Sequence, residues 1–277
     1  MTHSYADVAR LLSDNGLAPR RAFGQNFVVD PNTVRRIARL ADVGSNDHVL
    51  EIGAGLGSLT IALAETGAHI YAVEIDNGLV EVLRQVTAEL DNVRVIHDDA
   101  LTMDWGPLTE LSSNWQVVAN LPYNVATPLV ADLLDRVPQV QRMLVMVQRE
   151  VAERFVAVPR TAAYGAVSVK FAYWADARIV GDVPATVFFP KPKVASALVD
   201  IRRRPNPAVP DVVASELFAL VRAGFAQRRK MLRRVLSGLV PPSVFTIADV
   251  SPEARAEELD LQAWGRLCMA LHPLPKQ

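Results

Sequence analysis

Asn120-Leu121-Pro122-Tyr123 brings two hydrogen-bond acceptors and an aromatic ring together within four residues. An arylamine such as the exocyclic amino group of adenine is a poor nucleophile, because its lone pair is delocalised into the ring. The Asn120 side-chain oxygen and the Leu121 backbone carbonyl can accept its two N–H bonds and hold the nitrogen in line with a methyl donor. Pro122 stiffens the turn, and the Tyr123 ring offers a surface on which a base can stack. Taken alone, these residues fit a strand-end turn with a half-buried tyrosine equally well.

A glycine-rich turn, Gly53-Ala54-Gly55-Leu56-Gly57, follows an apolar strand and precedes a helical segment. Glycine lets the backbone turn tightly and lets a ligand lie against it. A dinucleotide-binding fingerprint needs its third glycine one place later, at Ser58, so this turn has a different spacing. Glu74 ends the next strand and can accept from both ribose hydroxyls of an adenosine, whereas Asp99 follows the third strand and can accept from the adenine amino group. Together the turn and the two acids favour S-adenosylmethionine over NAD as the cofactor.

Alternating strands and helices are expected to position these residues. Apolar runs predict strands, and the amphipathic segments between them predict helices. This alternation indicates an α/β fold with helices on both faces of a mainly parallel sheet, the Rossmann-like sheet of class I methyltransferases. Ligands bind at the carboxyl ends of the strands in such sheets, where both acids lie. The expected strands are 48–52, 70–74, 93–96, 116–120 and 143–147, followed by 167–173, 177–182 and 195–202.

Helical patterns also precede and follow the strand-containing region in the sequence. An N-terminal extension, 1–45, contains a helical segment at 5–15 and a second helix that Asp30-Pro31 opens, with Asp as N-cap and Pro at the first position. Three prolines within 204–210 break the strand–helix pattern, and only helical segments follow. We therefore expect a methyltransferase domain at 1–204 and a small all-helical domain at 205–277.

The composition is that of an ordinary globular protein. The chain has 277 residues, 50% of them hydrophobic, and a formal net charge of −1. The one cysteine excludes an intramolecular disulfide, and the five histidines lack partners at metal-ligand spacing, so no metal site is expected. Because no apolar run resembles a signal peptide or a membrane span, we expect a cytoplasmic protein without membrane contact.

Basic residues gather in one zone although the whole chain is nearly neutral. Residues 188–240 contain eleven Lys or Arg against three acids, and Arg20 and Arg21 add two more near the N-terminus. Such a zone suits RNA phosphates, although an isolated charge run is more often a solvated helix face. The residues that we expect to contact RNA are Arg20, Arg21, Lys193, Arg228, Arg229 and Lys230.

The chain resembles the bacterial ribosomal RNA adenine N6-dimethyltransferases, specifically the small-subunit (KsgA-type) enzymes. The resemblance implies that Asn26, the Val28 backbone and Gly53 contact the cofactor, and that Asn120 lies between cofactor and target. It also implies that Phe188 clamps the flipped adenine opposite Tyr123. Two departures are mild: Ala54 replaces the usual Pro, and Val28 the usual Leu. The matching stretches are Phe23–Phe27, Glu51–Gly57, Glu74–Asp76, Asp99-Ala100, Asn120–Asn124, Gln148–Arg154, Tyr164-Gly165, Phe188–Ala197 and Phe225–Lys230.

The resemblance implies a function. The family transfers methyl groups from S-adenosylmethionine, leaving S-adenosylhomocysteine, to N6 of two adjacent adenosines near the 3′ end of small-subunit (16S) rRNA, late in subunit biogenesis. The expected partner is this rRNA in an assembling subunit, and the expected state is a monomer. Alternatives are an RNA-binding assembly factor with secondary methylation, a large-subunit enzyme of the antibiotic-resistance type and a DNA adenine methyltransferase. Leu121 and the Arg-rich segment 225–234 argue against the large-subunit type, and no DNA-recognition module follows Pro205.

Overall fold

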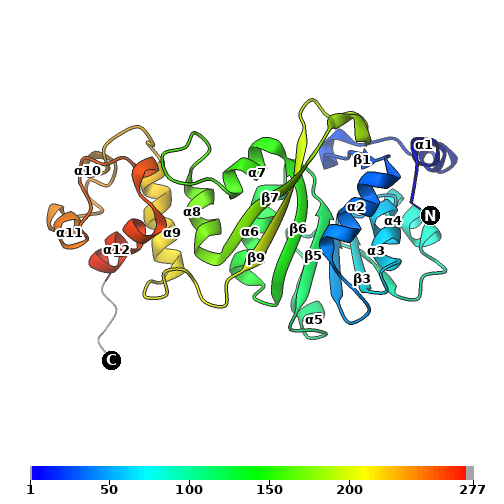
Figure 1. The fold of residues 1–277 in the computed structure, drawn as a ribbon, viewed down its shortest axis with the longest axis horizontal. Helices are drawn as coiled ribbons and strands as arrows, with labels where there is room; N and C mark the ends of the chain where they lie inside the picture. The colour runs from blue at the N-terminus through cyan, green and yellow to red at the C-terminus, as the bar shows by residue number, and fades with distance from the viewer. Residues whose placement is uncertain (1, 273–277) are drawn as a thin grey trace. The chain divides into compact units, whose positions relative to one another are not determined.

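The computed structural model describes residues 2–272 and separates into two compact units (Figure 1). The first contains the chain up to Ala152 together with Arg178–Arg203. The second contains Glu153–Ala177 and the chain from Arg204 onward. The predicted division into domains at 1–204 and 205–277 stays a prediction. The boundary between the two units near residue 204 lies close to the predicted one, but the second unit also includes Glu153–Ala177 from the middle of the chain. Within residues 2–272, none of the helices has the length and apolar character that crossing a membrane requires.

Seven strands form the sheet of the first unit in the order β4-β3-β2-β5-β6-β9-β7. The pairs β2–β3, β3–β4, β2–β5 and β5–β6 are parallel, and β6–β9 is antiparallel. The chain passes to β3 and β4 on one side of β2 and to β5 and β6 on the other, so the topology switches between β2 and β5, where open α/β sheets bind ligands. This arrangement confirms the predicted fold class. The strands are β2 (His48–Ile52), β3 (His69–Glu74), β4 (Val93–His97), β5 (Trp115–Asn120), β6 (Val140–Gln148), β7 (Ala175–Val183) and β9 (Ser196–Arg203).

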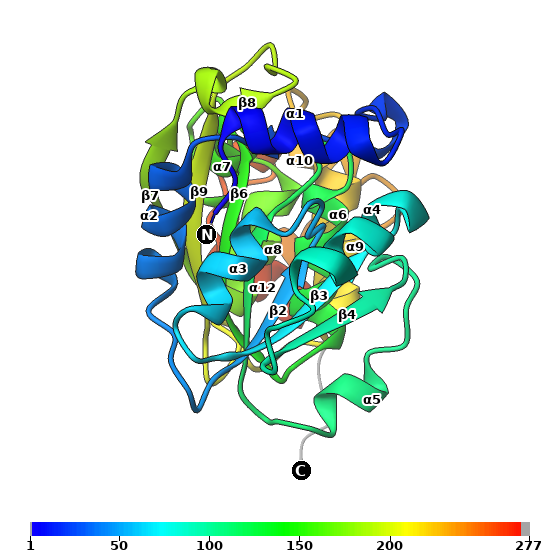
Figure 2. The same ribbon diagram turned by 90° about the vertical axis from the view of Figure 1, so that its right-hand side faces the viewer.

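Helices α2 (Pro31–Ala41) and α3 (Ser58–Ala64) pack against one face of this sheet and lie side by side (Figure 2). The apolar residues that they bury meet Val49 of β2 and Ile70 of β3 in one core. The Asp30 carboxylate caps α2 as predicted, because it accepts from the Asn32 and Thr33 backbone N–H groups. The other helices of this part of the chain are α4 (Asn77–Val86), α5 (Gly106–Thr109), α6 (Ala126–Arg136) and α7 (Arg149–Phe155).

The N-terminal segment lies at the ligand-binding edge of the sheet. Helix α1 (Tyr5–Asp14) packs through Val8 and Leu12 in a small core with Phe27 and Leu56. A 3-10 turn, η1 (Arg21–Phe23), then leads into β1 (Phe27–Val28), which pairs antiparallel with β8 (Phe188–Phe189) after the 3-10 turn η2 (Ala185–Val187). The loop 23–27, one of the stretches on which the family resemblance rests, is therefore fixed by the packing of Phe27 against α1 and by the pairing of β1 with β8.

The second unit is built mainly of helices around a core that includes Leu217, Val221 and Trp264. The strand predicted at 167–173 is wrong, because this segment lies in α8 (Ala166–Trp174). Its alternating apolar residues resemble a strand, but the short helix is buried on several sides, so no helical stripe is visible in the sequence. The remaining elements are α9 (Ala214–Phe225), α10 (Leu232–Val235), α11 (Pro242–Ile247), η3 (Ala256–Glu258) and α12 (Leu261–Leu271).

Candidate active site

A hollow opens at the carboxyl ends of β2, β3 and β5, and the glycine turn forms its floor. Gly53, Gly55 and Gly57 have φ angles of 74°, 59° and 84°, which side-chain-bearing residues rarely adopt. A Cβ on Gly55 would also lie 3.2 Å from the Phe27 ring. The turn therefore requires glycine both for its backbone and for the close approach of the N-terminal segment.

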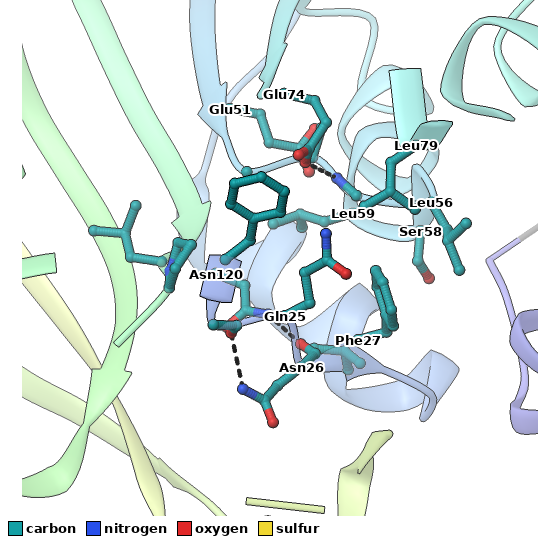
Figure 3. A pocket seen from close by; sticks show the side chains of 18 of the residues that line it. Gln25, Asn26, Phe27, Glu51, Leu56, Ser58, Leu59, Glu74, Leu79 and Asn120 are labelled. Atoms are coloured by element: carbon teal, nitrogen blue, oxygen red, sulfur yellow. Dashed lines mark hydrogen bonds between the residues drawn. The ribbon is translucent and has the colours of Figure 1, made fainter. Parts of the chain in front are cut away.

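Glu74 at the end of β3 is held by the backbone around it. One carboxylate oxygen accepts from Gly55 N at 2.8 Å (Figure 3). The other accepts from Ile75 N at 3.0 Å and Asp76 N at 2.9 Å. Burial raises the pKa of Glu74, and these N–H donors oppose that rise. A carboxylate has about four acceptor sites, and these three bonds leave one on Oε2, so the fixed carboxylate can still accept from a ribose hydroxyl in the hollow.

Glu51 of β2 also faces the hollow, and our sequence analysis gave it no role (Figure 3). Its side chain is fully buried, and Oε2 has no hydrogen-bond partner among the described residues. Burial, with the Glu74 carboxylate adding to it, raises the pKa of Glu51 to about 8. An acid within a buried strand, two residues before the glycine turn, is the signal that could have found it. A buried carboxyl with one oxygen left unpartnered fits a ligand that brings a positive charge or a hydrogen-bond donor.

The loop before β1 fixes the Asn120 side chain. Asn120 donates through Nδ2 to the Asn26 backbone oxygen at 3.0 Å, and Asn26 donates through its own Nδ2 to Gly24 O at 2.9 Å (Figure 3). This contact leaves Oδ1 of Asn120 as an acceptor. Gly24, with φ of 63°, lies against the reaction-centre turn, since a Cβ there would come within 3.2 Å of Pro122.

Arg20 and Gln25 attach the same loop to Asp76. Arg20 contacts one Asp76 carboxylate oxygen at 3.3 Å, and Gln25 donates to the other at 2.9 Å. The Gln25 side-chain oxygen in turn accepts from Arg20 N at 2.7 Å. Arg20 and Arg21, which we predicted as RNA contacts, are both exposed, but Arg20 also takes part in holding the loop beside Glu74 through its ion pair with Asp76.

Asp99 lines a second hollow, which shares the walls Phe23, Gly53, Ile75 and Pro122 with the first. One Asp99 carboxylate oxygen accepts from Leu101 N at 2.9 Å. Because Leu101, Ile75 and other apolar residues line this hollow beside Asp98 and Asp99, it is suited to a flat ring with a polar edge. The predicted cofactor residues are therefore divided between two neighbouring hollows: Asp99 lines the second, whereas Asn26, Val28, Gly55, Glu74 and Asn120 line the first.

The two aromatic residues predicted to clamp a base lie in different surroundings. Tyr123 is partly buried and lines the first hollow with Leu121. Phe188 is only 4% exposed and packs in the core with Val28 and Val34, and it lines neither hollow. The clamp between Phe188 and Tyr123 stays a prediction, and the position of Phe188 in the core gives it a structural role.

The Arg228 guanidinium in the second unit makes intramolecular contacts that stabilise the fold. It donates to the Glu257 carboxylate at 2.5 Å and to the backbone oxygens of Ala162 and Thr161 at 2.9 and 3.0 Å. Arg229 and Lys230 are exposed, and their side chains form no hydrogen bond or ion pair with any residue in 2–272. Lys193 is exposed as well. Four of the predicted RNA contacts therefore have an exposed side-chain charge that could bind a phosphate: Arg21, Lys193, Arg229 and Lys230.

The chain matches the ribosomal RNA adenine dimethylase family over residues 16–271. It belongs to this family. Similar curated proteins are called ribosomal RNA small subunit methyltransferase A. Those of Bifidobacterium adolescentis and Cutibacterium acnes are 44% and 46% identical to it, and each alignment covers 96% of this chain and 93% of the relative.

Two crystal structures share the fold. A dimethyladenosine transferase from Plasmodium falciparum has a TM-score of 0.73 and 23% identity, with 86% of this chain and 94% of that chain covered. The 23S rRNA methyltransferase ErmE has a TM-score of 0.67 and 26% identity, with 88% and 99% covered. Family membership implies S-adenosylmethionine as the cofactor. The Glu51 oxygen without a hydrogen-bond partner fits the positively charged part of this cofactor, and the fixed Glu74 carboxylate fits its ribose.

Proposed function

We propose that this protein dimethylates N6 of two adjacent adenosines near the 3′ end of small-subunit (16S) rRNA with S-adenosylmethionine, late in subunit biogenesis. The observation that carries the proposal is the orientation of Asn120. Its amide nitrogen donates to Asn26 O, so its oxygen is free to accept from an amino group beside the cofactor hollow. A cytoplasmic monomer that acts on rRNA in an assembling subunit stays our expectation.

The bound cofactor supplies a methyl group on a positively charged sulfur. Glu51 and Glu74 would hold its charged and ribose ends, Asp99 its adenine, and the turn from Gly53 its backbone-facing side. Asn120 Oδ1 and the Leu121 carbonyl would accept the two N–H bonds of adenine N6 and direct the nitrogen lone pair at the methyl carbon. After one transfer a single N–H remains, so one of the two acceptors suffices for the second transfer. The Tyr123 ring would hold the base by stacking.

The alternative target is large-subunit rRNA. The relatives called small subunit methyltransferase A are 44–46% identical, whereas the 23S rRNA methyltransferase is 26% identical. This difference favours the small subunit. In a second alternative, the protein acts mainly as an assembly factor that binds rRNA, and methylation is secondary. Both roles would use the same RNA-binding surface, so only a variant that binds the subunit without methylating it can distinguish them.

The test incubates the protein and labelled S-adenosylmethionine with undermethylated small subunits, and in parallel with large subunits, followed by nucleoside analysis. We expect N6,N6-dimethyladenosine in the small subunits only. Asn120→Ala should abolish it while leaving subunit binding unchanged. If wild-type protein forms no dimethyladenosine in small subunits, the proposed function is wrong. If it forms the product in large subunits instead, the alternative holds.

A further inference from the structure

Tyr123 is tied through its hydroxyl to a residue far away in the sequence. The Tyr123 Oη and Ser196 Oγ atoms are 2.8 Å apart and share a hydrogen bond. Ser196 is the first residue of β9 and is completely buried, whereas Tyr123 is partly buried beside the hollow. Burial raises the pKa of the Tyr123 hydroxyl, so it stays protonated at neutral pH and can share this bond.

Ser196 is itself held in place. It pairs with Gln148 in the antiparallel ladder between β6 and β9, and Arg149 N donates to the neighbouring Ala195 O at 3.0 Å. Its hydroxyl is thus a fixed point of the sheet. The Tyr123 backbone belongs to a turn after β5, which Leu121 N anchors to Met146 O at 3.1 Å. The tyrosine side chain is therefore fixed at both ends, at its backbone and at its hydroxyl.

We propose that Ser196 is a positioning residue for the methyl transfer, because its hydroxyl holds the far end of the Tyr123 side chain and so fixes the position of the ring against which the target base stacks. This inference rests on the proposed function. A tyrosine ring held only at its backbone can swing about its Cα–Cβ bond, and a stacked base moves with it. The distance and angle between the amino nitrogen and the methyl group then vary, and displacements of about 1 Å at a reacting centre cost on the order of 100-fold in rate.

The bond has a second consequence, because Ser196 ends the loop between β8 and β9. That loop carries Lys191 and Lys193, which are both exposed. A phosphate held by these lysines and a base held by Tyr123 would be kept at a fixed spacing by one hydrogen bond. The Ser196 hydroxyl would then link the position of the RNA backbone to that of the target base.

The test compares Ser196→Ala, Tyr123→Phe and the double variant with wild type in single-turnover methylation of small subunits at saturating cofactor. Both single changes remove the same hydrogen bond, and Tyr123→Phe keeps the ring. We expect each to lower the rate about tenfold, with the double variant no slower than either. Cofactor Kd and apparent substrate affinity should change less than about twofold, because ring orientation affects the reacting geometry more than binding.

Ser168→Ala is the matched control. Ser168 is also buried, and in the second unit its hydroxyl donates to Arg154 O at 2.7 Å and accepts from Gly165 N at 3.1 Å, so the substitution removes buried hydroxyl bonds outside the hollow. It should lower thermal stability at least as much as Ser196→Ala does while keeping the wild-type rate. If Ser196→Ala does not fold, Tyr123→Phe alone decides.

A wild-type rate in Ser196→Ala or in Tyr123→Phe would overturn the inference and leave the proposed function intact. Rate losses that multiply in the double variant would also overturn it, because the two hydroxyls would then act independently. If wild-type protein produces no dimethyladenosine, both the proposed function and the inference fail.

Discussion

Two buried carboxylates in the first unit have opposite surroundings. Asp200 of β9 is 2% exposed and contacts three arginines, Arg142 at 2.7 Å, Arg178 at 3.1 Å and Arg202 at 3.2 Å. Glu51 of β2 is equally buried, but one of its oxygens has no partner in the described part of the chain and its charged neighbour is another acid, Glu74. The first acid is satisfied within the fold, and the second is left for a ligand.

The pKa values of the two acids follow this difference. Burial would raise the pKa of Asp200, but the hydrogen bonds and charges of its arginines outweigh burial and hold the pKa below its ordinary value. For Glu51, burial outweighs the lowering effect of the nearby Thr60 hydroxyl, the Glu74 carboxylate adds to the rise, and the pKa is raised to about 8. A buried charge with partners is a structural element, whereas one without partners costs stability unless a ligand neutralises it.

The largest expected effect is on stability, from Asp200→Asn. The substitution leaves the Arg142 guanidinium, 18% exposed, without its counter-charge, although its contacts to Leu40 O and Ala41 O remain. Removing one partner of a buried pair costs about 3 kcal/mol, which denaturant unfolding would measure. Asp182→Asn is the control: Asp182 is exposed and pairs with Arg149 at the surface, so its loss should cost less than about 1 kcal/mol. Equal losses in both variants would contradict the comparison.

Glu51→Gln should separate binding from stability. We expect about a tenfold weaker Kd for S-adenosylmethionine, because the cofactor's ammonium group loses a buried anionic partner. The unliganded protein at pH 8 should be at least as stable as wild type, because no carboxyl has to ionise in the core. Isothermal titration with 5′-methylthioadenosine, which lacks the amino-acid end, provides the control and should give equal Kd values for both proteins. A loss of affinity for both ligands would show that the variant disturbs the hollow as a whole.

The raised pKa of Glu51 also predicts a pH dependence. Between the ordinary value of 4.5 and about 8, the folded state holds a proton that the unfolded state has released, so the free energy of unfolding falls as pH rises. One proton gives a slope of at most about 1.4 kcal/mol per pH unit. The difference between wild type and Glu51→Gln in urea unfolding at pH 6 and pH 8 reports this contribution together with the coupling of Glu51 to Glu74, because groups that do not interact with Glu51 cancel. A pH-independent difference would place Glu51 in a solvated or paired environment.

Features set by a few neighbouring residues could be predicted from the sequence. The glycine spacing, the Asp30 cap and the order of strands and helices depend on local backbone preference and periodicity, and the structure follows them. Asn120 beside the glycine turn follows from the same reasoning, because carboxyl ends of parallel strands meet at one edge.

Features set by distant partners could not be predicted. Nothing near Arg228 in the sequence shows that Glu257 and two backbone oxygens take up its donors. The helix at 166–174 was mistaken for a strand because burial on several sides depends on tertiary packing. The contact between Tyr123 and Ser196 joins segments 73 residues apart, beyond the reach of any local pattern.

The smallest expected effect is on rRNA binding, and it extends the comparison from acids to basic residues of the second unit. Arg229→Ala with Lys230→Ala removes two exposed charges without partners among residues 2–272, so we expect unchanged stability and weaker rRNA binding. Each phosphate contact contributes about 0.7 to 0.9 to the slope of log affinity against log salt, so the slope should fall by up to about 2. Arg228→Ala, measured alongside, should instead lower the free energy of unfolding by about 1 to 2 kcal/mol, because it breaks contacts to Glu257, Thr161 and Ala162, and should leave the salt slope unchanged. A salt slope that changes in Arg228→Ala but not in the double variant would reverse the assignment, since phosphate binding would then involve the arginine that the fold already uses.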